Sequence, residues 1–434
     1  MSLALIGFLT IVIMLTLIMT KKLQTLLALI IVPIIGCLVA GQGSQLGTFI
    51  TEGLQNIAPT GVMFIFAILF FGVMSDAGTF DPIVKGILKV VGKDPVKICI
   101  GTFLLAAIVH LDGSGAVTFL IAIPALLPLY QKLGMKATTL ATLVALGAGV
   151  MNMLPWGGPT IRAITAMKSD INGVFIPMLI PMAVGFIVIL VMAVFLGKSE
   201  KKRLGETLND IDLDELDQEE TPEDVALKRP KLFVVNLILI VLAVFVMLKS
   251  ILPPAAVFMI GTALALIINY PDMKIQKERV DAHAKAALMM ASMLFAAGSF
   301  IGIMQGSGML TAIAQTIVTF IPASLGGFIP ILVGILGVPL SLVFDPDSYY
   351  YGVLPVLSQA VDMMGGDPLS VARASIAGQM TLGFPISPLT GATFLLTGLA
   401  GIDLAEHQRK TLPLAWGASI VIVIVAAITG AIAF

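Results

Sequence analysis

Long apolar runs, separated by short polar stretches, recur along the whole chain. They are continuously apolar rather than alternating, which is typical of membrane-spanning α-helices and not of membrane β-strands. The pattern predicts an all-α, polytopic membrane protein. The expected helices lie at about 3–20, 23–40, 58–75, 97–111, 115–129, 138–153, 159–168 and 174–196, and then at 232–249, 254–270, 286–304, 327–344, 348–363, 370–384, 388–400 and 411–433.

Two pairs of predicted helices are short and joined by a tight polar turn. The helices at 97–111 and 115–129 would each be about 21 Å long, against roughly 30 Å for a bilayer core. The two turns read DGSG and DPDS, beginning at Asp112 and Asp345. We predict two re-entrant hairpins whose tips end inside the protein. Two full spans per pair would leave the orientation of the other helices unchanged.

Two later helices are each interrupted by two prolines. The strings LPWGGPT and FPISPLT begin at Leu154 and Phe384, and each follows its hairpin at a similar distance. Proline removes a backbone donor and clashes with the preceding turn, so both segments should be broken helices. Each half then has five crossings and one hairpin. An odd number of crossings inverts the second half relative to the first, as in many secondary transporters.

The polar composition fits this division. Residues 1–197 form the first predicted repeat, residues 198–231 an acidic cytoplasmic linker, and residues 232–434 the second repeat. The chain is 58% hydrophobic and 12% charged, whereas soluble domains carry roughly 25% charged residues. Its net charge of −1 gives no signal for nucleic acid.

The basic residues indicate the orientation. If both termini lie outside and each hairpin returns to its own side, nearly all of the 25 Lys and Arg residues face the cytoplasm. This bias is the positive-inside rule. It predicts a multi-pass protein of the bacterial inner membrane. The four exceptions are Arg162, Lys168, Lys249 and Arg373.

Two tips and two breaks should meet near mid-membrane and form a site. Half-helices starting near Thr160 and Leu389 offer N–H groups and a positive dipole end to a carboxylate. Carboxylate, hydroxyl and freed carbonyl oxygens suit a cation. Such a site takes an organic anion and its accompanying cation. The candidates are Asp112, Gly113, Ser114, Gly115, Asn152, Pro155, Gly157, Gly158, Thr160, Arg162, Asp347, Ser348, Ser387 and Thr390.

Several of these residues allow a second interpretation. Asp112 is the sharpest candidate, because an ionised carboxylate in a membrane is costly unless paired, but it could cap its own turn. Asp112, Asp345 and Asp347 are candidate metal ligands, although the last two also fit an ordinary Asp-Pro turn. Arg162 could clamp a carboxylate or snorkel outward. With no nucleophile–base pair or phosphate loop, the sequence does not predict an enzyme.

The chain resembles the CitMHS family of metal–citrate:proton symporters, within the ion transporter superfamily. Its first half carries the likeness in Phe66–Asp81, Leu111–Gly115, Leu127–Met135 and Gly149–Arg162. The second half carries it in Asp347–Pro355, Ala372–Gln379, Ser387–Leu389 and Glu406–Arg409. The resemblance implies an elevator-like homodimer that binds its substrate at the tips and breaks.

The resemblance also implies a substrate. We expect symport of citrate, as a complex with Mg²⁺ or Ca²⁺, together with protons and without a tightly bound cofactor. Ser114 stands where the family often has a second acidic residue, and the segment from Met380 to Phe384 also departs from the usual pattern. The metal and the coupling ion are therefore left open. The alternative is a sodium- or proton-coupled carrier of a dicarboxylate, gluconate or lactate.

Overall fold

The chain folds into helices whose order along the first half resembles their order along the second. The computed structural model describes residues 2–20, 22–82, 86, 92, 94–205, 226–249, 251–320 and 323–433. The first half contains α1 (Leu3–Met19), α2 (Thr25–Val39), α3 (Leu46–Asp76), α5 (Pro95–Val109), α6 (Gly115–Lys132), α7 (Ala137–Met151), α8 (Gly158–Ala166), α9 (Ile171–Val174) and α10 (Leu179–Leu204).

The second half follows the same sequence of elements. It contains α12 (Phe233–Leu248), α13 (Pro254–Asn269), α14 (Met273–Gly306), α15 (Met309–Phe320), α16 (Ile329–Leu340), α17 (Leu354–Met363), α18 (Pro368–Ile376), α19 (Gly391–Ala400) and α20 (Leu404–Ile428). Each half thus has two shorter helices, a long helix, a hairpin, a broken helix and a final long helix. Within the predicted linker, residues 206–225 with most of its acidic side chains lie outside the described part of the chain, whereas Glu200 lies in α10.

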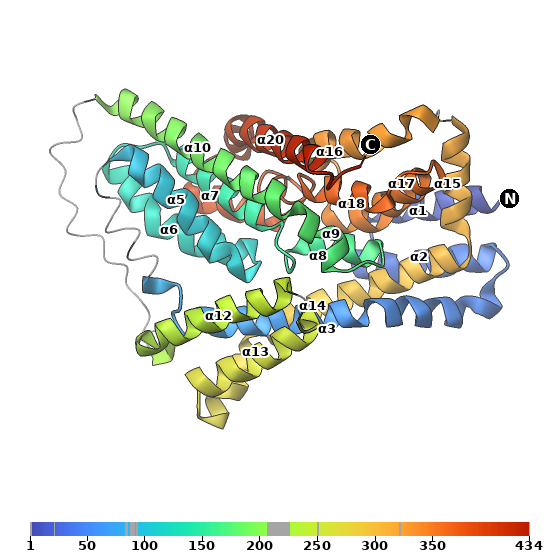
Figure 1. The fold of residues 1–434 in the computed structure, drawn as a ribbon, viewed down its shortest axis with the longest axis horizontal. Coiled ribbons are helices and arrows are strands. Elements are labelled where there is room, and N and C mark those ends of the chain that lie inside the picture. The colour runs from blue at the N-terminus through green and yellow to red at the C-terminus, as the bar shows by residue number, and fades with distance from the viewer. Residues whose placement is uncertain are drawn as a thin grey trace.

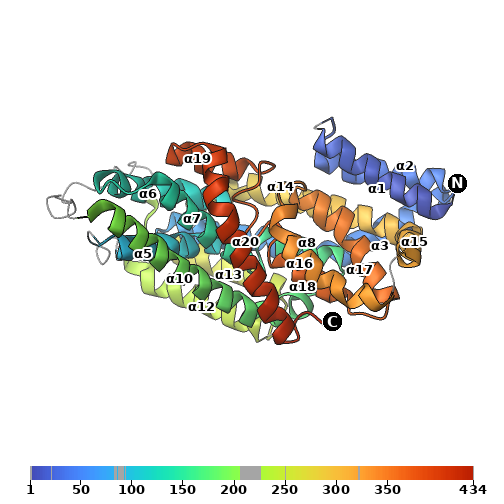
Figure 2. The same ribbon diagram turned by 90° about the horizontal axis from the view of Figure 1, so that it is seen from above.

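The elements form two bundles (Figure 1). The long-helix bundle contains α3, α12, α13 and α14, with α1 and α2 packed at one end. The hairpin bundle contains α5 to α10 and α16 to α20. Figure 2, which views the molecule from above, shows α20 crossing the hairpin bundle and α1 and α2 at the end where the N-terminus lies.

Corresponding long helices of the two halves run antiparallel. Along α3, Gly53 faces Gly298 of α14, whereas Gly72, further along, faces the earlier residue His283. In the other bundle, Gly185 of α10 meets Ile422 of α20 in the same antiparallel sense as Gly417 meets Met192. Antiparallel packing of equivalent helices is what an inverted repeat requires.

Six helical segments in the described part are long and apolar enough to cross a membrane: Gly43–Asp76, Gly115–Lys132, Ile171–Leu204, Pro230–Met247, Met273–Gly306 and Leu404–Ile428. Shorter apolar helices accompany them. The structure therefore has the character of a multi-pass membrane protein.

Some boundaries differ from those that hydropathy predicts. Helices α3 and α14 begin at Leu46 and Met273, well before their apolar runs, because polar residues continue a helix beyond the hydrocarbon region. Helix α6 extends to Lys132 and has 18 residues. That is about 27 Å, which is nearly enough to cross a bilayer core of roughly 30 Å. Helix α5, with 15 residues, is too short to do so.

Candidate functional site

The first hairpin tip is a 3-10 turn followed by a capped helix. The turn spans His110–Asp112, and Gly113 follows with φ +75°, a left-handed conformation that glycine adopts without steric cost. Ser114 caps α6 by accepting a hydrogen bond from the Val117 amide. Asp112 supplies backbone to the turn; its side chain lies outside the described part.

The second tip is closed by a carboxylate. Asp345 Oδ1 accepts hydrogen bonds from the Asp347 and Ser348 amides, both at 3.0 Å, and its Oδ2 accepts the Ser348 hydroxyl at 2.7 Å. The π-helical turn Ser348–Val353 then leads into α17. The Asp345 carboxylate is thus occupied by the local turn, as one of the two interpretations of this motif anticipated.

A buried ion pair joins the two halves. Arg162 Nε of α8 donates to Asp347 Oδ1 at 2.6 Å, and the two side chains are 10% and 12% exposed. Arg162 Nη1 also donates to the Gly158 carbonyl at 3.1 Å. Arg162 therefore points into the protein, not outward, and it binds a carboxylate at the opposite tip.

The two helix breaks cross each other. The first break lies between α7 and α8, and the second runs from Ala377 to Thr390, longer than the proline pattern indicates. Asn152 Nδ2, in the first break, donates to the Met380 carbonyl at 2.9 Å. The Met380 amide donates to Ser341 Oγ beside the second tip at 2.9 Å. One residue of the second break thus binds both the first break and the second tip.

His110 connects the first tip to this crossing. Its Nδ1 lies 2.8 Å from Thr118 Oγ1, and its Nε2 lies 3.5 Å from Asn152 Oδ1. The imidazole stacks on Phe384 of the second break, with ring centroids 5.8 Å apart. Trp156 of the first break also binds the first tip, because its Nε1 donates to the Leu111 carbonyl at 2.8 Å. The first tip and both breaks therefore form one continuous network.

The remaining candidates shape the backbone. Thr160 donates to the Met153 carbonyl and Thr390 to the Phe384 carbonyl, both at 2.8 Å. Ser387 Oγ accepts from the Leu389 amide at 3.1 Å. At Gly157 an added Cβ would collide with the Asn152 carbonyl oxygen, so only glycine fits there.

Two further glycines and a proline complete the predicted set. Gly115 lies against Phe384, where an added Cβ would stand 2.7 Å from the ring, and at Gly158 it would stand 3.0 Å from Arg162 Nη1. Pro155 lies in the turn of the first break. Hence both tips and both breaks gather in one buried region, with the Arg162–Asp347 pair at its edge.

The structure adds residues that sequence reasoning missed. Met380 has φ +53°, a conformation that is uncommon for residues other than glycine and that clusters at functional sites. Tyr350 donates its hydroxyl to the Gln379 carbonyl at 2.8 Å. The Gln379 Oε1 and Thr381 Oγ1 atoms are buried without a hydrogen-bond partner among the described residues. Tyr350 lies in the segment Asp347–Pro355 that carries part of the family resemblance, and Met380 begins the segment that departs from the family pattern, but neither residue was predicted to belong to the site.

No three His, Cys, Asp or Glu side chains in the described ranges gather as a metal site. Asp345 caps its turn and Asp347 binds Arg162. A role for Asp112, Asp345 and Asp347 as metal ligands stays a prediction.

The fold matches that of a solved membrane transporter. The YdaH transporter of Alcanivorax borkumensis superposes with a TM-score of 0.64 at 13% identity, covering 89% of this chain and 88% of that one. At this identity the likeness concerns the fold alone. The fold and the membrane-spanning helices define the class, a multi-pass helical membrane protein with a transporter fold.

The sequence comparisons identify the family. A family model described as "Citrate transporter" (CitMHS) matches residues 1–378. A "Citrate transporter" of Bacillus subtilis (strain 168) is 42% identical over 432 residues, covering 100% of both chains. A "Mg(2+)/citrate complex secondary transporter" of the same organism is 40% identical over 437 residues, covering 99% of both. The chain belongs to the CitMHS citrate transporter family.

Proposed function

We propose that this protein is a secondary active symporter that carries citrate as a complex with a divalent cation, coupled to protons. The observation that carries the proposal is the buried Arg162–Asp347 pair, which joins a half-helix of one half to a hairpin tip of the other. A guanidinium in this position can exchange its carboxylate partner for a substrate carboxylate. The N-terminal turn of α8 adds a partial positive charge beside it.

The charge of the site favours a metal complex over free citrate. Citrate carries about −3 near pH 7 and about −1 when it chelates one divalent cation, and uncompensated charge is costly in a low-dielectric interior. The Arg162–Asp347 pair itself carries no net charge, so the complex, with its smaller charge, is the easier of the two to accommodate. In this proposal the metal enters already chelated by citrate. The relative named as a Mg(2+)/citrate complex secondary transporter supports the proposal that the metal travels as a complex with citrate.

In this proposal the hairpin bundle carries the site and moves against the long-helix bundle, and the protein is a homodimer. Breaks and tips move as one body in this proposal because Met380 binds both Asn152 and Ser341. The long-helix bundle stays fixed in this proposal, because α3 and α14 pack closely along their length.

Counterflow in proteoliposomes tests the substrate. Labelled citrate should exchange in the presence of Mg²⁺ or Ca²⁺ and not in EDTA, and a proton gradient that is acidic outside should drive uptake. A protonophore should abolish that uptake. Exchange driven by sodium, or of a dicarboxylate, gluconate or lactate in place of citrate, would favour the alternative carrier. No citrate exchange under any metal condition would exclude citrate.

A further inference from the structure

A polar cavity lies far from the place where the two helix breaks contact each other. It has a volume of about 500 Å³ and is lined by the start of α7, the segment between α19 and α20, and the first turns of α20. Helix α7 runs from this cavity to Asn152 and has 15 residues, so about 22 Å separate the two places. The volume lies within the roughly 300–1,000 Å³ of small-molecule sites.

The lining of this cavity is mainly cationic. Lys136, Arg409 and Lys410 contribute three positive charges, and Glu406 contributes one negative charge. None of the four enters an ion pair within the described part of the chain. The lining of the cavity therefore has a net positive charge, and its three cations form no ion pair with an acidic side chain of the described residues.

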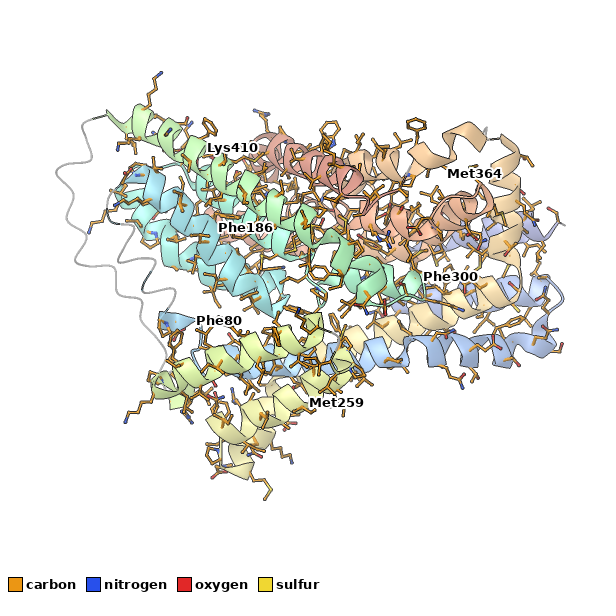
Figure 3. The ribbon with its side chains drawn as sticks, in the orientation of Figure 1. Phe80, Phe186, Met259, Phe300, Met364 and Lys410 are labelled. Carbon is orange, nitrogen blue, oxygen red and sulfur yellow. The ribbon has the colours of Figure 1, made fainter. Side chains whose placement is uncertain are left out.

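Lys410, labelled in Figure 3, is held in place by a buried relay. Its Nζ donates to Thr139 Oγ1 at 2.5 Å, and the threonine hydroxyl donates to Glu200 Oε1 at 2.6 Å. The other Glu200 oxygen accepts from Arg203 Nη2 at 2.6 Å. The Glu200 carboxylate is thus paired with Arg203, and the Lys410 ammonium, held by the threonine hydroxyl, lines the cavity near the Glu200 and Glu406 carboxylates.

We propose that this cavity is a binding site for a small polyanion bearing two or more carboxylate or phosphate groups. Three cations around one solvent-open cavity match such a ligand better than a single carboxylate, because each added anionic group meets another cation. The site is separate from the Arg162–Asp347 region, and the proposal does not depend on the transported substrate. A soluble anion and a lipid headgroup share this chemistry.

Pyrophosphate binding in EDTA tests the site. The full-length protein, in nanodiscs of uncharged phosphatidylcholine, is titrated calorimetrically at about 0.15 M salt, which screens diffuse surface attraction. The variant Lys136→Gln/Arg409→Gln changes exposed side chains only and should weaken binding at least tenfold. Adding Lys410→Gln should weaken it further. The control Lys132→Gln/Lys202→Gln removes the same charge from exposed positions outside the cavity and should leave binding unchanged.

A second arm distinguishes the two sources of anion. In nanodiscs containing cardiolipin, whose headgroup carries two phosphates, loss of pyrophosphate binding by the unmodified protein would assign the cavity to a lipid headgroup, and unchanged binding would assign it to a soluble anion. Both outcomes support a polyanion site. The proposal is overturned if pyrophosphate does not bind in uncharged lipid, or if the cavity variant and the control bind it equally.

Discussion

At the scale of single residues, Arg162 and Asp347 show how a charged pair is tolerated inside this protein. Their side chains are nearly buried and 2.6 Å apart, so each compensates the charge that the other brings into a low-dielectric region. Removing one partner leaves the other charge buried and unpaired. The pair should therefore be sensitive to single substitutions and less sensitive to removal of both charges.

Arg162→Gln should lower the free energy of unfolding by about 3–5 kcal/mol and abolish citrate uptake. The double variant Arg162→Gln/Asp347→Asn should recover much of the stability without recovering uptake, because the guanidinium is still missing. Thermal unfolding in detergent and uptake by proteoliposomes measure the two effects.

The matched control is Lys201→Gln, which breaks the exposed Lys201–Asp94 pair and should change stability by about 1 kcal/mol or less. An Arg162→Gln protein with normal uptake would contradict the proposed role of this residue in substrate binding.

At the scale of elements, glycines set the distance between α3 and α14. Gly53 of α3 faces Gly298 and Gly302 of α14. An added Cβ at Gly302 would collide with the Phe49 carbonyl oxygen and lie 2.8 Å from Gly53 Cα. Small residues let helix backbones approach closely, which is how helices associate in membranes without a hydrophobic driving force. The long-helix bundle therefore depends on positions that carry no side chain.

Gly302→Val should separate α3 from α14 and strongly destabilise the protein, since backbone atoms cannot yield as a flexible side chain can. Gly47→Val is the control, because an added Cβ there meets nothing within 4 Å. Size-exclusion profiles and thermal unfolding in detergent compare the two variants. Equal behaviour would mean that this close approach does not hold the bundle together.

At the scale of the whole molecule, protein covers the second hairpin tip more completely than the first. Ser348 is fully buried, and Ser114 is partly buried. The expected orientation places residues near Ser44 outside the cell and residues near Lys202 in the cytoplasm.

Single cysteines, introduced after Cys37 and Cys99 are replaced, test this topology with an impermeant maleimide. Ser44→Cys should react in intact cells, and Lys202→Cys only after permeabilisation. Ser114→Cys and Ser348→Cys should react slowly in both cases because protein covers the tips. Rapid reaction of both tip cysteines from opposite surfaces would rule out a shared buried site.

The sequence alone determined the class of the protein and located the segments that the structure brings together. Apolar run length, the distribution of basic residues and the paired prolines are local properties, so they locate helices, tips and breaks without knowledge of packing. Hydropathy could not locate the starts of α3 and α14, because apolar and polar residues are mixed in the first turns of both helices.

Only the tertiary structure decided how these parts meet. Arg162 could equally have pointed outward until Asp347, 185 positions away along the chain, was seen to bind it. The left-handed backbone conformation of Met380 could not be predicted from the sequence, since it is stabilised by contacts with Asn152 and Ser341 from other elements. Local pattern fixes what a segment can form, whereas pairing between distant segments depends on the packing of the whole chain.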